Sequence, residues 1–164
     1  SAKALPLAEL FASLNPALSH DVHAGVAVTL DGALLGKQAG LVLNLDSTSS
    51  PANFILVYLD GRGNVVVEEC VAGTYTTKQT TSVTYSAGAV LRVAKRGTTL
   101  IVWYNIALVG AAQTMTTNVN KLFGIFKTSP LCSLDTFEWW AFLIHIGRHG
   151  NVITFVPQVL RGTR

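Results

Sequence analysis

The strongest constraint on the fold is a two-residue alternation of apolar side chains that recurs along the chain. In residues 90–104, Leu91 and Val93 alternate with other residues, a polar break containing a glycine follows, and Leu100 and Val102 alternate again. Successive side chains of a β-strand point to opposite faces, so this spacing predicts strands with one face toward a core. A short glycine-containing break between two such runs predicts a hairpin. We therefore expect these four side chains to be buried between two sheets.

Runs of this kind follow one another along most of the chain, about ten to twelve in all. One run places Val22, Ala24, Val26 and Val28 on a single face, and two later runs are separated by Gly61-Arg62-Gly63. Many short strands at even spacing, without alternating helices, are typical of an all-β sandwich. The predicted fold class is therefore all-β, a two-sheet antiparallel jelly-roll sandwich.

One segment near the N-terminus has a helical pattern instead. The stretch ALPLAELFASL, residues 4–14, repeats apolar side chains at helical spacing, and Pro16 would end a helix there. An extended arm with a turn is the alternative interpretation of the same residues.

The composition is apolar for a chain of 164 residues, with 13% charged and 49% hydrophobic residues. The apolar runs are short and broken, and all fall well below the roughly 18 residues that a membrane helix needs. We therefore expect no membrane insertion. The apolar excess predicts strands that are buried on both faces, or surfaces that meet other chains.

The charged and metal-ligating residues are too scattered to form a recognisable site. The net charge is +3, and the basic residues stand singly apart from Lys95-Arg96 and the C-terminal residues, so we expect no nucleic-acid partner. We expect Cys70 and Cys132 to be small buried side chains, and a disulfide between them is the alternative. His20 and His23 would face opposite sides of a strand, which is poor for chelation. No metal ligands are assigned.

The order of several motifs is similar to that of concanavalin A-like (laminin-G-like) jelly-roll modules. The matching stretches are LFASLNPALSHDVHAGVAVTL, AGLVLNLD, NFILVYLDGRGNVVV, LRVAKRGTTLIVWYNIALVG, LFGIFKTS and LDTFEWWA. The resemblance covers residues 11–142 and implies a jelly-roll domain over 1–142. Residues 143–164 are then a C-terminal extension, which we expect to dock on a sheet of its own sandwich or of a neighbouring subunit.

One turn departs from the pattern of these modules. They often have Asp-Gly or Asn-Gly after the second of the paired strands, whereas this chain has Asn105-Ile106-Ala107. A type I′ turn needs positive φ at both central residues, which isoleucine resists. The sequence therefore predicts a longer turn, or one of another type.

The resemblance implies a non-catalytic carbohydrate-binding module of a larger secreted or surface protein, with a glycan or polysaccharide as its ligand. The alternative is a structural or assembly subunit of a virion, fibre or surface layer with the same fold, which would form a homo-oligomer or a larger assembly. Either function implies an extracellular, cell-surface or virion location. Members of this group often hold calcium at a rim, so calcium is the one cofactor that the resemblance allows, with no ligands assigned among Asp21, Asp46, Asp60 and Asp135.

No catalytic residues are expected. Related glucanases need carboxylates that alternate along one strand face, close enough to act as nucleophile and acid. Here Glu68 and Glu69 are adjacent, and Asp135 and Glu138 are three apart, so each pair should point to opposite faces of an extended strand.

Aromatic side chains are the candidate ligand-binding residues, because an exposed aromatic ring offers a rigid apolar face on which sugar rings stack. If Val102 faces the core, Trp103 must face the other way, where a binding site, an interface and core packing are equally open alternatives. The complete set of candidates is Trp103, Tyr58, Tyr75, Tyr85 and Trp140.

Overall fold

The computed structural model describes residues 11–14, 21–30, 37–116, 119–129, 131–141, 144–145, 152–153 and 158–159. Within these ranges no helix is long and apolar enough to span a membrane. The same ranges contain fifteen β-strands, which are β1 (Phe11–Leu14), β2 (Val22–Leu30), β3 (Ala39–Leu45), β4 (Phe54–Leu59), β5 (Asn64–Val71), β6 (Thr74–Ser82), β7 (Ala89–Arg96), β8 (Thr99–Tyr104), β9 (Ala107–Leu108), β10 (Gln113–Thr114), β11 (Leu122–Lys127), β12 (Cys132–Ala141), β13 (Ile144–His145), β14 (Val152–Ile153) and β15 (Gln158–Val159).

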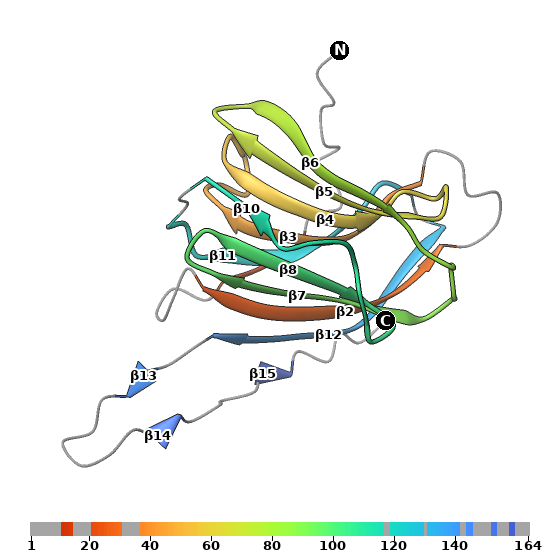
Figure 1. Cartoon of the computed structure of the whole chain (residues 1–164). Helices are drawn as coiled ribbons and strands as arrows, with labels where there is room; N and C mark the ends of the chain where they lie inside the picture. The colour runs from red at the N-terminus through yellow and green to blue at the C-terminus, as the bar shows by residue number, and fades with distance from the viewer. Residues whose placement is uncertain are drawn as a thin grey trace.

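The strands form two antiparallel sheets that pack face to face (Figure 1). A six-stranded sheet has the order β1-β11-β3-β4-β5-β6 and is the upper layer in Figure 1. A seven-stranded sheet has the order β10-β8-β7-β2-β12-β15, with β9 pairing to β8, and is the lower layer. Strands β13 and β14 form a separate pair. The predicted all-β jelly-roll sandwich of the concanavalin A-like type is confirmed.

The main core lies between the two sheets, where the alternating side chains meet. Leu91, Val93 and Leu100 have exposed fractions of 0%, and Val102 has 3%. They share one cluster with the inward side chains of β2, β3, β4 and β5. The predicted burial and register of β7 and β8 are therefore confirmed, since Val93 pairs with Val102 across the hairpin.

A second apolar layer covers the outer face of the six-stranded sheet. Strands β3 and β4 are buried along their whole length, so both of their faces are covered, as the apolar composition predicts. The buried members of this outer cluster are Val42, Leu45, Phe54, Leu56, Tyr58, Val66, Cys70 and Phe126.

The helix prediction for residues 4–14 is wrong where it can be examined. Phe11–Leu14 form β1 and pair antiparallel with Leu122–Ile125 of β11, while residues 4–10 lie outside the described ranges. Helical spacing of apolar residues is only a weak indication of a helix. In this segment the backbone N–H and C=O groups are satisfied by pairing with the edge of a sheet and not by helical hydrogen bonds. The alternative of an extended arm agrees with β1.

The prediction for the turn after β8 is also wrong. Tyr104 pairs with Ala107, so Asn105 and Ile106 alone form the loop, and their φ angles are 46° and 68°. Positive φ at both central residues is the type I′ arrangement, whose twist matches that of paired strands. Hairpin pairing therefore imposes a left-handed conformation on a β-branched residue that resists it.

The C-terminal extension contributes one strand to the seven-stranded sheet. Gln158 and Val159 of β15 pair with Trp139 and Glu138 of β12. The proposed boundary at residue 142, and the extension's role in assembly, stay predictions.

Candidate functional site

The candidate site lies on the outer face of the seven-stranded sheet, around Trp103. Val102 points into the core, so strand alternation turns the half-buried Trp103 outward. Arg92 of β7 lies directly opposite Trp103, and Gly25 of β2 lies directly opposite Arg92. Directly opposed residues of antiparallel strands share a face, so these three positions form one row across three strands.

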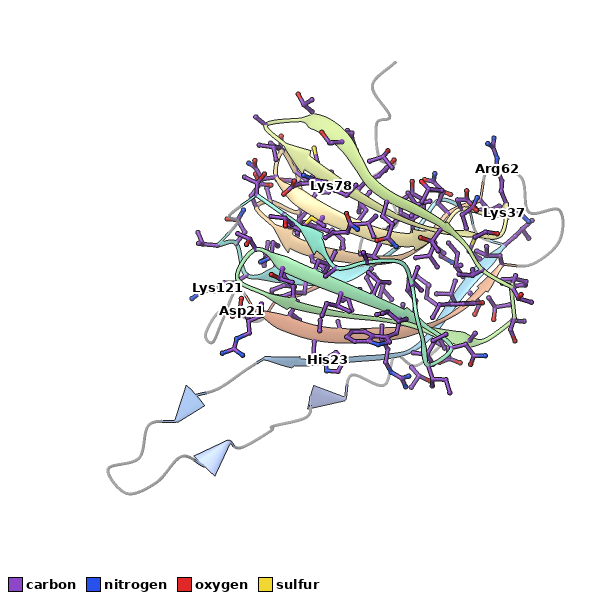
Figure 2. The ribbon with its side chains drawn as sticks, viewed as in Figure 1. Asp21, His23, Lys37, Arg62, Lys78 and Lys121 are labelled. Carbon is purple, nitrogen blue, oxygen red and sulfur yellow. The ribbon has the colours of Figure 1, made fainter. Side chains whose placement is uncertain are left out.

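An imidazole ring lies beside the indole ring. The ring centroids of His23 and Trp103 are 6.3 Å apart and their planes are tilted by 50°. Figure 2 shows His23 below β2, on the side of the sheet away from the six-stranded sheet. Burial lowers the pKa of His23, and the charge of Arg92 lowers it further. A neutral imidazole at pH 7 offers one hydrogen-bond donor and one acceptor.

Gly25 leaves room for the side chain of Arg92 at the β2 end of the row. A Cβ placed on Gly25 would lie 3.1 Å from Cγ of Arg92, so the missing side chain lets the arginine stem lie over the β2 backbone. Among the described residues no hydrogen bond or ion pair engages the guanidinium of Arg92. A guanidinium carries five N–H donors. Glu138 of β12 pairs with Gly25 in the same register, and its side chain lies outside the described part.

The row continues onto the short strand β9. Leu108 lies opposite Trp103 and is 60% exposed. Ile106, at the tip of the β8–β9 hairpin, is 85% exposed. The row therefore combines an aromatic face, the charged donors of Arg92 and an exposed apolar edge. This combination suits a ligand that has both apolar C–H faces and hydroxyl groups.

The structure does not bring the five predicted ligand-binding residues into one site. Trp140 pairs in backbone register with His23, which places its backbone beside the row, while its side chain lies outside the described part. Tyr58 and Tyr75 belong to the outer cluster of the other sheet. Tyr85 packs against the main core, and its hydroxyl donates to the carbonyl of Leu30 at 3.2 Å.

Tyr58 is closed to a ligand in this arrangement. It is 2% exposed, and its ring meets that of Phe126 edge-on with centroids 5.7 Å apart. Tyr75 packs in the same way on Phe54, at 5.6 Å, but stays half-buried. Burial raises the pKa of both hydroxyls, that of Tyr75 to about 12. Both rings therefore act mainly as packing groups here.

The four aspartates available for a calcium rim each accept a hydrogen bond from the backbone. Asp46 accepts hydrogen bonds from the backbone N–H groups of Ala52 and Asn53, and Asp60 accepts them from Arg62 and Asn64. Asp21 accepts from the N–H of Gly97 at 2.7 Å and Asp135 from that of Thr136 at 2.9 Å. In the described ranges, no three metal-ligating side chains come together. Such bonds are typical of aspartates in turns and at strand ends, and calcium binding stays a prediction.

Glu68 and Glu69 point to opposite faces of β5, as strand alternation predicts, and the two cysteines are buried as expected. Glu69 is 4% exposed, whereas its half-buried neighbour Glu68 lies near the outer-face Tyr58, so the two point to opposite faces. Cys70 and Cys132 are buried free thiols. The side chain of Glu138 lies outside the described part.

A buried group of charges at one end of the sandwich was missed by the sequence analysis. Lys95 is 0% exposed, and its Nζ has no hydrogen-bond partner among the described residues. Glu69 forms an ion pair with Lys78, at 2.9 Å, and accepts a 2.6 Å hydrogen bond from the backbone of Thr116. Burial lowers the pKa of Lys95, although Asp21 and Glu69 act in the opposite direction. The sequence did contain a signal for the burial of Lys95, because this residue lies two positions after the buried Val93 and therefore on the same strand face.

Solved structures of carbohydrate-binding proteins share this fold. The chain is similar to the carbohydrate-binding module CBM66 from Bacillus subtilis, with a TM-score of 0.59, 15% identity, and coverage of 77% of this chain and 78% of that one. It is similar to sheep galectin-11 in complex with glycerol, with a TM-score of 0.56, 12% identity, and coverage of 83% and 99%.

A third similar structure is a much longer protein. The chain matches part of the GH43 protein BlXynB, a K247S mutant, from Bacillus licheniformis, with a TM-score of 0.57 and 17% identity. The match covers 75% of this chain and 28% of that one. No family model and no curated protein matches the sequence. The chain therefore has the concanavalin A-like jelly-roll fold that these structures share.

Proposed function

We propose that this chain is a non-catalytic carbohydrate-binding module whose ligand lies on the outer face of the seven-stranded sheet. The observation that supports it best is the row of Gly25, Arg92 and Trp103, with His23 beside the indole. The indole of Trp103 is half-buried beside His23, and its remaining exposed surface is the stacking face that we propose. The guanidinium of Arg92, which no described residue engages, donates hydrogen bonds to hydroxyl or ring oxygens of the ligand.

Two further observations support a binding role over a catalytic one. The carboxylates Glu68 and Glu69 lie on opposite faces of β5, so this pair cannot flank one glycosidic bond. The comparisons add that a carbohydrate-binding module and a galectin share the fold. A glycan ligand fits a module that meets its partner outside the cell, on a cell surface or on a virion, within a longer protein.

The test is binding of soluble polysaccharides by native affinity electrophoresis, followed by calorimetric titration. We expect Trp103→Ala to weaken binding at least about tenfold, because the stacking face is lost. Tyr75→Ala, on the outer face of the other sheet, is the matched aromatic control and should leave affinity unchanged. Circular dichroism checks that both variants keep the fold. Loss of binding in Tyr75→Ala alone would move the site to the six-stranded sheet and overturn the proposal.

An assembly function remains the second candidate, and one observation favours it. Ile106 and Leu108 expose apolar side chains next to Trp103, as an interface between subunits would. Light scattering at low and high protein concentration separates the two functions. A monomer that binds glycans supports the module, whereas an oligomer that Trp103→Ala dissociates supports assembly.

A further inference from the structure

We propose that the ligand is the interior of an extended polysaccharide chain that lies across β2, β7, β8 and β9, not a single terminal sugar. This inference rests on the proposed function and specifies the class of glycan. It is based on the length of the row and on the exposure of the side chains at its β9 end.

The row is long enough for several sugar rings. Gly25, Arg92, Trp103 and Leu108 are opposed in register from strand to strand. Neighbouring strands are about 4.8 Å apart, so three intervals span about 14 Å, roughly the length of three pyranose rings. One ring can stack on Trp103 while its neighbours meet the arginine stem on one side and Leu108 on the other.

The row is open where a terminal-sugar site would be enclosed. At β9 the side chains of Leu108 and Ile106 are 60% and 85% exposed, so a chain can continue past this edge. A site for a chain end surrounds the last sugar with hydrogen-bonding groups, as small-molecule pockets do. A pocket of about 200 Å³ does exist, but it lies beside β5, where Glu69 and Cys70 help to line it, away from Trp103.

The hairpin tip supports a contact at this edge. Ile106 adopts a φ of 68°, where glycine or asparagine fits without strain, and its side chain is largely exposed. An isoleucine here therefore costs stability and gains little burial within the chain. A strained residue of this kind is typical of a functional surface. It adds an apolar wall beside Leu108, where the polysaccharide would leave the sheet.

The experiment measures how affinity depends on ligand length. The probes are oligosaccharides of one to six units prepared from cellulose, xylan and laminarin, each also with both chain ends capped as alkyl glycosides or ethers. For the series that binds, we expect affinity to rise at least tenfold from one to three units and then level off. Capping both ends of the hexamer should change affinity less than twofold.

A variant of Leu108 tests whether the bound polysaccharide crosses β9. Leu108→Ser should weaken binding of three or more units about threefold to tenfold, while the affinity for shorter probes stays the same. Thr77→Ser, an exposed position on the other sheet, is the control. Length-independent affinity that is lost on capping would overturn this inference and leave the proposed function intact, provided that Trp103→Ala still weakens binding at least about tenfold. Failure of every probe and every parent polysaccharide to bind would overturn both.

Discussion

Replacing Ile106 by glycine should stabilise the protein, although it removes a large apolar side chain. The left-handed conformation costs a non-glycine residue about 1–2 kcal/mol, and Ile106 has a φ of 68°. Glycine removes this strain but adds flexibility to the unfolded chain, at a cost of about 0.5–1 kcal/mol. Little burial is lost, because the side chain is 85% exposed.

The expected net gain is about 0.5–1 kcal/mol in the free energy of unfolding. In a chain of this size, that corresponds to a rise in Tm of about 1–4 °C. Urea denaturation followed by tryptophan fluorescence measures it, with an unchanged slope against denaturant as the sign that the same transition is compared. Thr99→Gly is the matched control, since Thr99 is exposed, lies in β8, the strand that leads to this turn, and has no positive φ.

We expect the control to lose about 0.5–1 kcal/mol, because glycine within a strand costs entropy without relieving strain. If Ile106→Gly loses as much as Thr99→Gly, the turn does not store strain. The functional meaning given to Ile106 would then lose its basis. If the variant gains stability but binds long oligosaccharides less tightly, stability and function compete at this tip.

Three further predictions concern the core and the charges near it. Lys95→Met should raise the free energy of unfolding by about 1–3 kcal/mol, because a buried amine that has no hydrogen-bond partner among the described residues is replaced by an apolar side chain of similar volume; a loss in urea denaturation would show that Lys95 is well solvated or paired. His23 has a folded pKa lowered by burial and by Arg92, so its stability contribution is complete above the unfolded pKa of about 6.5 and is lost as pH falls through that value toward the folded pKa. Denaturation midpoints from pH 7.5 to 5 should therefore fall more steeply in the wild type than in His23→Gln, and parallel profiles would contradict this. Leu100→Ala should cost about 2–5 kcal/mol through lost burial and a cavity, and an unchanged Tm would mean that the register is wrong.

The sequence was sufficient where one short-range rule decided the structure. Period-two spacing placed Leu91, Val93, Leu100 and Val102 in the core, and the same rule turned Trp103 outward. It also separated Glu68 from Glu69. In each case the next residue along the strand has no choice of face, so the pattern alone determines it.

Sequence reasoning failed where partners distant along the chain decided the outcome. Pairing with β11 makes Phe11–Leu14 a strand, and the twist of the β8–β9 hairpin forces Ile106 to positive φ. Both outcomes override a local preference of the residues themselves.

The candidate site was predicted only in part for a similar reason. Trp103 was named as a candidate. Arg92, Gly25 and His23 lie beside it only because of how β2, β7 and β8 pair, and the sequence alone does not give the register of these pairings. Tyr58 was named as a ligand-binding residue from its aromatic side chain alone, and packing on Phe126 covers it. The burial of Lys95 followed from the spacing that placed Val93, but a lysine in a core is uncommon enough to be overlooked.

The most direct test of the account is to map the bound polysaccharide onto the sheets by NMR. Backbone amide shifts of the 15N-labelled chain are followed while a hexasaccharide from the binding series is added. The account predicts perturbed amides in residues 23–27, 90–94, 101–104 and 106–108, with those of β4, β5 and β6 unchanged. Perturbations confined to β4, β5 and β6 around Tyr58 and Tyr75 would contradict it, because the ligand would then lie on the outer face of the six-stranded sheet.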